Sequence, residues 1–209
     1  MKVSKTVRTD NIDFYVIKLA KYELLPSITH ILNLSISQKK FPTKWKTAKV
    51  VPLHKKDDKN NPKNYRPVAL LPSLSKILEK AIFIQITTYL NENNLLHPSH
   101  HGFREGHNTS TALIQMYDQW IEAFDEDKLS AVILIDMSAA FDVVDYSILT
   151  DKLKLYGFEE NIIVWIQSYL MNRYQQVTVD GQLSDLLSLE AGVPQGSILG
   201  PLFYLLSVS

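Results

Sequence analysis

The spacing of apolar residues predicts five helices along the chain. In each of them apolar side chains recur every three or four positions, which places them on one face of a helix. The expected helices cover residues 24–36, 74–90, 109–124, 146–156 and 162 to about 172. Residues that favour helix ends lie at their boundaries. We expect caps at Ser73, at Asn108 or Thr109, at Asp145 and at Asn161, and a helix stop at Gly157.

One of these helices, at 109–124, carries a long aromatic and aliphatic stripe. The stripe consists of Leu113, Met116, Tyr117, Trp120, Ile121 and Phe124. Stripes of this kind cover the core in most globular proteins. We therefore expect this face of the helix to be buried.

Shorter apolar segments predict strands. Ala48–Leu53 indicates a short strand, and the continuous apolar run Ala131–Ile135 is typical of a strand covered on both faces. Asp180-Gly181 separates Gln176–Val179 from Gln182–Leu189 and supplies the positive φ angles of a tight hairpin turn. Helices mixed with a few separated strands and hairpins predict an α+β fold.

Composition narrows the class of protein. A chain of 209 residues with 45% hydrophobic content is long enough for one domain, or for one domain and part of a second. No apolar run approaches the roughly 18 residues that span a bilayer, so we expect no membrane partner. The absence of cysteine excludes disulfides and thiolate metal sites, and suits an intracellular protein without distinguishing nucleus from cytoplasm.

The formal net charge of zero is the sum of two opposed regions. Residues 39–66 contain ten Lys or Arg and two Asp, a net charge of +8. Residues 118–160 contain eleven carboxylates and three Lys, a net charge of −8. Such segregation suits a surface that grips phosphates beside one that binds cations, although Lys-rich stretches are also common as solvated faces.

Three stretches carry candidate chemistry. Asp136 directly follows the apolar run Ala131–Ile135, and a carboxylate there suits a Mg²⁺ ion or caps a turn. The loop Gly192–Pro201 places two glycines and a proline around Gln195, so its backbone can approach a ligand closely. The third is the basic loop that ends in Asn64-Tyr-Arg-Pro67, whose arginine can clamp a phosphate with two hydrogen bonds.

Four segments in this order resemble successive motifs of non-LTR retrotransposon (LINE-like) reverse transcriptases. They are PKNYRPVALLPSLSKILEK (62–80), HHGFREGHNTSTAL (100–113), AVILIDMSAAFDVVDYSILTDKL (131–153) and AGVPQGSILGPLFYLL (191–206). The weaker stretch 28–56 resembles the region upstream of the fingers, so the resemblance covers about residues 20–209. The related group II intron maturases usually have a threonine before Pro-Gln-Gly, whereas the valine here matches the retrotransposon form.

The resemblance implies roles for the residues around Asp136. Asp136 matches the first metal-binding catalytic aspartate of the polymerase palm, and the backbone carbonyl of Met137 would help to hold the second ion. Phe141 matches the bulky residue that stacks below the incoming sugar and excludes a ribose 2′-hydroxyl. Asp142 belongs to the Ala-Phe-Asp signature and is expected to support the site structurally.

Further roles follow for the loops. Gln195 and Gly196 match residues that line the nucleotide pocket. Arg66, together with Lys55 or its neighbour Lys56, matches the finger residues that neutralise the triphosphate. Arg104 is a candidate contact to the nucleic-acid backbone.

The activity implied by the resemblance is RNA-directed DNA polymerisation. A primer 3′-hydroxyl attacks the α-phosphate of a deoxynucleoside triphosphate, two Mg²⁺ ions stabilise the charge, and pyrophosphate leaves. The expected partners are an RNA template, a DNA primer and deoxynucleoside triphosphates, and the sequence leaves the oligomeric state open.

The resemblance also implies that the chain contains several regions of a polymerase and lacks others. We expect an upstream helical extension at 1–44, fingers at 45–130 and a partial palm at 131–209, with an incomplete palm sheet and no thumb. No Tyr/Phe-x-Asp-Asp segment follows the last motif, so we expect a carboxy-truncated fragment that cannot polymerise DNA by itself. The alternative is a domesticated nucleic-acid-binding module that has lost catalysis.

Overall fold

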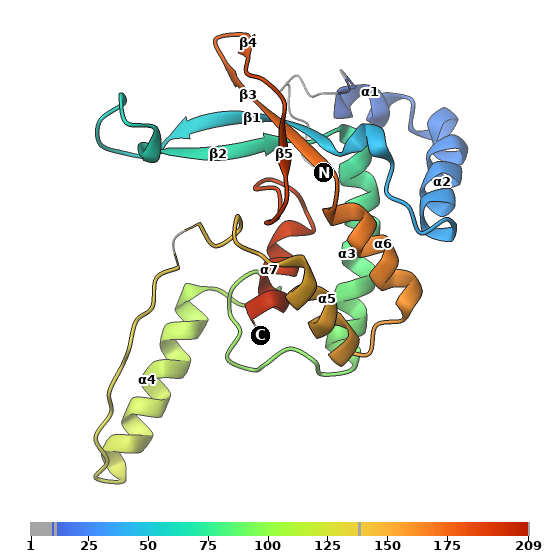
Figure 1. Ribbon diagram of the computed structural model, residues 1–209. Helices are drawn as coiled ribbons and strands as arrows, with labels where there is room; N and C mark the ends of the chain where they lie inside the picture. Colours follow the sequence, from blue (N-terminus) through green and yellow to red (C-terminus); the bar gives the residue numbers. More distant parts are fainter. Residues whose placement is uncertain (1–9, 11, 138, 209) are drawn as a thin grey trace.

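The computed structural model describes residues 10, 12–137 and 139–208. Within them a small sheet lies beside a group of packed helices, and one long helix projects from this body (Figure 1). The α+β class predicted from the sequence is confirmed. Residues 1–9 and 11 of the predicted upstream extension lie outside the described residues.

The first part of the chain forms two helices against the body. They are α1 (Phe14–Leu19) and α2 (Lys21–Ser37), and a 3₁₀ turn at Thr43–Trp45 leads from them to the sheet. The helix predicted at 24–36 is therefore confirmed, with Pro26 inside its first turns. Phe41, after α2, is inserted edge-on against Trp165 and Tyr169.

The sheet joins strands from distant parts of the sequence. Its members are β1 (Thr47–His54), β2 (Tyr65–Leu70), β3 (Arg173–Val179), β4 (Gln182–Leu183) and β5 (Leu187–Leu189). The spatial order is β2-β1-β3-β4, and β5 also pairs with β3. The β1–β3 pair is parallel and the other pairs are antiparallel.

The predicted hairpin at Asp180-Gly181 is confirmed. The φ angles of these two residues are 48° and 81°, the left-handed values that a tight hairpin turn requires. On either side, Val179 pairs with Gln182.

Four helices build the core. They are α3 (Ser73–Glu92), α5 (Tyr146–Leu155), α6 (Glu160–Leu170) and α7 (Gly200–Val208). Their buried faces meet in one apolar cluster whose largest members are Trp165, Tyr169 and Phe203. Val193 and Leu199, on either side of Gln195, belong to the same cluster, which thus anchors the loop before α7.

Helix caps follow the sequence at some boundaries and depart from it at others. Asn108 and Asp145 cap the next helices by accepting backbone N–H groups, and Gly157, with φ of 79°, follows the end of α5. The cap predicted at Ser73 is wrong, because Ser73 is already helical and its hydroxyl donates to the carbonyl of Ile12 (2.6 Å). The cap predicted at Asn161 is also wrong, because α6 begins one residue earlier.

The buried stripe predicted on the helix at 109–124 is also wrong. Helix α4 (Thr109–Asp125) forms as expected but contains no buried residue, and Phe124 at its far end is 80% exposed. Figure 1 shows α4 as an arm that projects from the body. No described segment covers the stripe, so the amphipathic pattern has no apolar partner here.

The strand predicted at Ala131–Ile135 is likewise not formed. These residues follow the α4 arm back to the body without a strand partner among the described residues, and Ile133, Leu134 and Ile135 are 84–87% exposed. A strand needs a neighbour for its backbone groups, and no described strand takes that place. Among the helices of the described chain, none combines the length and apolar character needed to cross a membrane.

Candidate functional site

The loop that carries Gln195 is fixed first to the segment after Asp136. The N–H of Val193 donates to the carbonyl of Phe141 (2.7 Å), and the N–H of Gly192 donates to that of Val144 (2.9 Å). The hydroxyl of Tyr146 donates to the carbonyl of Gly192 (2.9 Å). Burial raises the pKa of Tyr146, which keeps the phenol protonated as a donor.

The same loop is also fixed to the sheet. The N–H of Ala69 in β2 donates to the carbonyl of Gln195 (2.6 Å). Gly196 has φ of 115°, and a Cβ atom there would lie 2.7 Å from the carbonyl oxygen of Ala69. Only glycine allows this close approach, because both the backbone angle and the space exclude a side chain.

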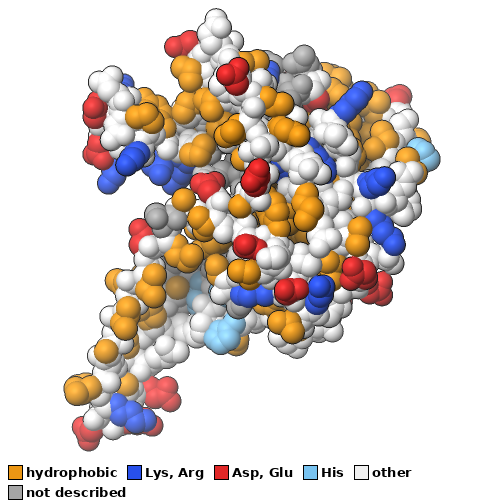
Figure 2. All heavy atoms as spheres, viewed as in Figure 1, with side chains coloured by type: hydrophobic (Ala, Val, Ile, Leu, Met, Phe, Trp, Pro, Cys, Tyr) orange, Lys and Arg blue, Asp and Glu red, His pale blue; other side chains and the backbone are white. Residues whose placement is uncertain are grey.

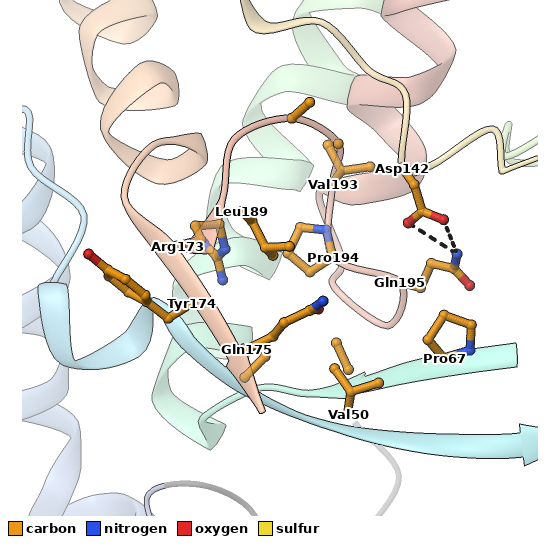
Figure 3. Close-up of a pocket in the computed structure, with 14 residues that line it drawn as sticks. Val50, Pro67, Asp142, Arg173, Tyr174, Gln175, Leu189, Val193, Pro194 and Gln195 are labelled. Carbon is orange, nitrogen blue, oxygen red and sulfur yellow. Dashed lines mark hydrogen bonds between the residues drawn. The ribbon is translucent and has the colours of Figure 1, made fainter. Parts of the chain in front are cut away.

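These two attachments bring Gln195 to Asp142. The side-chain amide of Gln195 faces the Asp142 carboxylate at 3.4 and 3.5 Å from its two oxygens, which are long hydrogen bonds (Figure 3). The structure therefore joins residues from two of the motifs, 53 positions apart in the sequence. The Gln195 side chain is half-buried and the Asp142 side chain is exposed.

A cavity of about 250 Å³ lies between this loop and the sheet. Its polar side chains include Asp142, Arg173, Gln175 and Gln195 (Figure 3). Ligand sites usually have volumes of about 300–1,000 Å³, so this cavity is large enough for part of a nucleotide only.

Arg66 and Lys55 lie on the β1–β2 hairpin, outside this cavity. Pro67 and Ala69 line the cavity, and successive residues of a strand face opposite sides of the sheet. The exposed Arg66 side chain therefore faces the other side. Lys55 is exposed beyond the end of β1, and its N–H donates to the carbonyl of Asn64 across the hairpin (2.8 Å).

Phe141 belongs to a cluster of three aromatic rings. Its ring centroid lies 5.2 Å from that of Tyr204 and 5.7 Å from that of Phe103. Phe103 precedes the half-buried Arg104, which donates to the carbonyl of His97 (3.3 Å). The cluster thus holds the Arg104 segment beside the Gln195 loop.

Asp136 and Met137 lie outside the cavity, and Met137 reaches Tyr204 of the aromatic cluster. Both are exposed on the segment that returns from α4. The hydroxyl of Tyr204 lies 3.8 Å from the sulfur of Met137, which ties this segment loosely to α7.

A metal ion would find a partial set of ligands here. The Asp136 carboxylate and the Met137 carbonyl are oxygen donors of the kind Mg²⁺ prefers. Within the described parts of the chain, however, no three His, Asp or Glu side chains are grouped so that they could hold a metal ion. The described residues therefore fit one or two ligands of an ion and do not form a complete two-metal site.

Comparison with known proteins decides the family. Residues 53–209 match the family model described as reverse transcriptase (RNA-dependent DNA polymerase). The match covers all four motifs and the Gln195 loop. The chain belongs to the reverse transcriptase family.

Curated relatives agree with the retrotransposon form of the motifs. The chain is 32% identical over 205 residues to the probable RNA-directed DNA polymerase from transposon BS of Drosophila melanogaster. It is 31% identical to the RNA-directed DNA polymerase from mobile element jockey of the same fly. It is 33% identical to the probable RNA-directed DNA polymerase from transposon X-element, also of this fly. These matches cover 98%, 98% and 86% of this chain but only 22%, 22% and 20% of the relatives.

The surface of this reverse transcriptase segment is hollowed beside the site. Figure 2 shows the hollow between the β1–β2 hairpin and the α4 arm, with Lys and Arg side chains gathered on the hairpin. The exposed cations at this end of the hairpin are Lys55, Lys56, Lys59, Lys63 and Arg66. Half of the ten cations in the basic stretch at 39–66 thus lie exposed on the hairpin, whereas Lys46 of the same stretch is buried.

Sequence reasoning missed four residues that shape the site. Phe103 and Tyr204 pack against Phe141, Arg173 lines the cavity while only 1% exposed, and Glu79 is fully buried beneath the Gln195 loop. A signal existed for Glu79, because it lies at helical spacing among the apolar residues of α3. Phe103 and Tyr204 lie within two of the four motifs, whereas Arg173 lies outside them.

Proposed function

We propose that this chain is part of an RNA-directed DNA polymerase and supplies its nucleotide-contacting loop and its first metal-binding aspartate. The reaction of the intact parent would be template-directed nucleotidyl transfer from a deoxynucleoside triphosphate to a primer 3′-hydroxyl. The observation that carries the proposal is the Gln195 loop, which is fixed to β2 on one side and to residues 141–144 on the other. Membership of the family supports the same function.

Each residue of the site would act on a different part of the substrate. Gln195 and the backbone at Gly196 would contact the nucleotide, and the ring of Phe141 would lie against its sugar. Arg66 and Lys55 would neutralise the triphosphate. Because Arg66 faces away from the cavity, the triphosphate would lie outside the cavity, toward the hairpin.

Asp136 and the carbonyl of Met137 would hold Mg²⁺ together with ligands from elsewhere in the parent enzyme. When bound, two such ions stabilise charge on the attacking and leaving oxygens of the transferred phosphate. An RNA template and a DNA primer would be the nucleic-acid partners, and Arg104 would contact their backbone.

Replacement of Asp136 tests this proposal directly. In the intact parent enzyme we expect Asp136→Asn to lower primer extension by about a hundredfold or more, because metal-bound charge stabilisation contributes several kcal/mol. The exposed Asp118 on α4 provides the control, as Asp118→Asn should leave extension unchanged. Near-normal activity of Asp136→Asn would refute the role of Asp136.

The purified 209-residue chain should extend no primer, because its described residues hold an incomplete set of metal ligands. A second candidate function, nucleic-acid binding without catalysis, is favoured by the exposed cations of the hairpin. Salt-dependent RNA binding by this chain that is independent of Mg²⁺, with Asp136→Asn harmless in the parent, would support that alternative.

A further inference from the structure

A carboxylate is fully buried beneath the Gln195 loop. Glu79, in the second turn of α3, is 0% exposed and lies among the buried apolar residues of that helix. A buried carboxylate is costly unless hydrogen bonds compensate for the water that it has lost. Its presence in the core therefore needs a specific set of donors.

The donors come from α3 and from the segment before α7. The hydroxyl of Ser75, one turn earlier, donates to Oε1 of Glu79 (2.7 Å). The N–H of Ile198 donates to Oε2 (2.7 Å), and the N–H of Leu199 approaches the same oxygen at 3.4 Å. Hydrogen bonds to a charged acceptor are about twice as strong as neutral ones.

These amides directly follow a tight turn at Pro194–Ser197 that contains Gln195. The N–H and the hydroxyl of Ser197 both donate to the carbonyl of Pro194, and Oγ of Ser197 accepts the N–H of Gly200 (2.9 Å). Glu79 thus holds one end of the turn. The contact of Gln195 with Ala69 in β2 holds the other end.

The surroundings of Glu79 contain a second polar group. Burial first, and then the Glu79 carboxylate, raise the pKa of Tyr169, while Arg173 and Ser197 lower it. The net shift is upward, so Tyr169 stays neutral beside the carboxylate.

We propose that Glu79 is a positioning residue for the nucleotide-contacting loop. It binds the amides of Ile198 and Leu199 from the core side and so sets where Gln195 and Gly196 lie above β2. The proposal rests on the proposed function in one respect, namely that Gln195 contacts the nucleotide. Glu79 itself touches no substrate.

Two substitutions separate positioning from simple filling of the core. Glu79→Met keeps the length of the side chain but removes both acceptors, so the donors at Ser75, Ile198 and Leu199 lose their partner. Glu79→Gln keeps one carbonyl oxygen for the two amides and can donate its NH₂ group to Ser75. A residue that only fills space would tolerate both changes equally.

Amide hydrogen exchange of the ¹⁵N-labelled 209-residue chain measures the anchoring. We expect Glu79→Met to speed exchange at Ile198 and Leu199 by at least about tenfold relative to the amides of α6, because each lost hydrogen bond to a charged group is strong. Glu79→Gln should restore most of the protection. Ser75→Ala is the matched control, because it removes a donor to Glu79 that does not belong to the loop.

Titration with dTTP and Mg²⁺ measures the consequence for the ligand. Glu79→Met should weaken dTTP binding several-fold, whereas Glu79→Gln and Ser75→Ala should leave it close to that of the original chain. Unchanged exchange at Ile198 and Leu199 in Glu79→Met would overturn the proposal. Equally fast exchange at Ile198 and Leu199 in Ser75→Ala would also overturn it. The same holds if Glu79→Met speeds exchange at these amides but leaves dTTP affinity unchanged.

The two proposals fail in different ways. If the original chain binds no dTTP while the loop still loosens in Glu79→Met, the nucleotide role of Gln195 is wrong and the anchoring by Glu79 stands. If dTTP binds and Glu79→Met changes neither measurement, the nucleotide site stands and Glu79 has no positioning role.

Discussion

Gly196 determines how closely the loop before α7 approaches β2. Its backbone adopts a φ of 115° and lies against the carbonyl of Ala69. Any side chain at this position would push the loop away from the sheet. The neighbouring Gln195 would then lose the hydrogen bond that its carbonyl accepts from Ala69.

Replacement of this glycine should therefore affect both fold and ligand. We expect Gly196→Ala to lower the free energy of unfolding by about 1–3 kcal/mol, the usual cost of a residue held in a disfavoured backbone region. It should also weaken dTTP binding. Gly102→Ala is the control, since a Cβ atom at Gly102 meets nothing within 4 Å. Urea unfolding and dTTP titration check both effects, and identical curves for the two variants would contradict the prediction.

At this scale the structure brings together some of the residues that the motifs suggested and leaves others apart. Gln195 and Asp142 come from two motifs that the resemblance placed in one site, and they meet in the structure. Glu79 was missed because a carboxylate on an amphipathic helix is usually assigned to the solvated face. Its partners, the amides of Ile198 and Leu199, lie about 120 residues away and leave no local pattern.

At the scale of single elements, α5 shows a helix start that the sequence identifies. Asp145 accepts the N–H groups of Ser147 and Ile148, as the capping pattern predicted. The hydrogen bond from the Ser147 side chain, followed by those from the two amides, lowers the pKa of Asp145 from its usual 3.8.

The cap should make stability depend on pH in acid. Because the folded pKa lies below the unfolded one, the charged cap stabilises the protein fully above pH 3.8 and loses this effect as the pH falls through the folded pKa. The difference in urea midpoint between the original chain and Asp145→Asn should therefore be constant near neutral pH and shrink in acid. A difference that stays constant down to about pH 2 would exclude this role for Asp145.

Helix α4 presents the opposite case, in which a helix forms without the packing that its pattern predicts. Its capping box between Asn108 and Thr111 forms as the local sequence favours. Its apolar face is exposed nonetheless, as is the run Ala131–Ile135 that follows. Exposed apolar surface of this extent marks an interaction site or a liability to aggregation.

Substitutions on α4 should leave the stability of the isolated chain almost unchanged. We expect Phe124→Ser to alter the free energy of unfolding by less than about 0.5 kcal/mol. Phe203→Ala, in the core at 0% exposure, should cost about 3–5 kcal/mol. Binding of the dye ANS should fall in Phe124→Ser. A large loss of stability in Phe124→Ser would show that the stripe is packed in solution.

The two packing errors, at α4 and at Ala131–Ile135, have one physical origin. An amphipathic period shows that a face favours burial, but it does not identify the segment that covers it. For α4 and for Ala131–Ile135 no covering segment occurs among the described residues. The hairpin at Asp180-Gly181 was predicted correctly because its turn chemistry is local.

At the scale of the whole molecule, charge is distributed as the sequence indicated. Exposed cations lie on the β1–β2 hairpin, and acidic residues are concentrated toward the far end of α4 (Figure 2). A phosphate backbone bound to the hairpin would displace counterions from the nucleic acid, so its affinity should depend strongly on salt.

Removal of two hairpin lysines should make the affinity for RNA depend less steeply on salt concentration. We expect Lys56→Ala combined with Lys59→Ala to reduce the slope of log affinity against log salt for single-stranded RNA by about 1.4, at about 0.7 per phosphate contact. The control replaces Lys18 and Lys21 by alanine, since both are exposed on α1 and α2 away from the hairpin. Fluorescence anisotropy at several salt concentrations gives the slopes, and equal slopes for the two variants would count against a hairpin contact.

The parallel pairing of β1 with β3 has a consequence for synthesis on the ribosome. Lys46, just before β1, donates to the carbonyl of Met171, just before β3, and these residues are 125 positions apart. The β1–β2 hairpin is therefore translated long before its central neighbour exists. The hairpin is complete at Leu70 and β3 ends at Val179, so at about 5–20 residues per second the hairpin waits roughly 5–22 seconds with one edge unprotected. Closure of the sheet is therefore slow, because it joins distant parts of the chain. Variants in which β3 pairs late should fall in cellular abundance, through chaperones and proteases, before they lose ligand affinity.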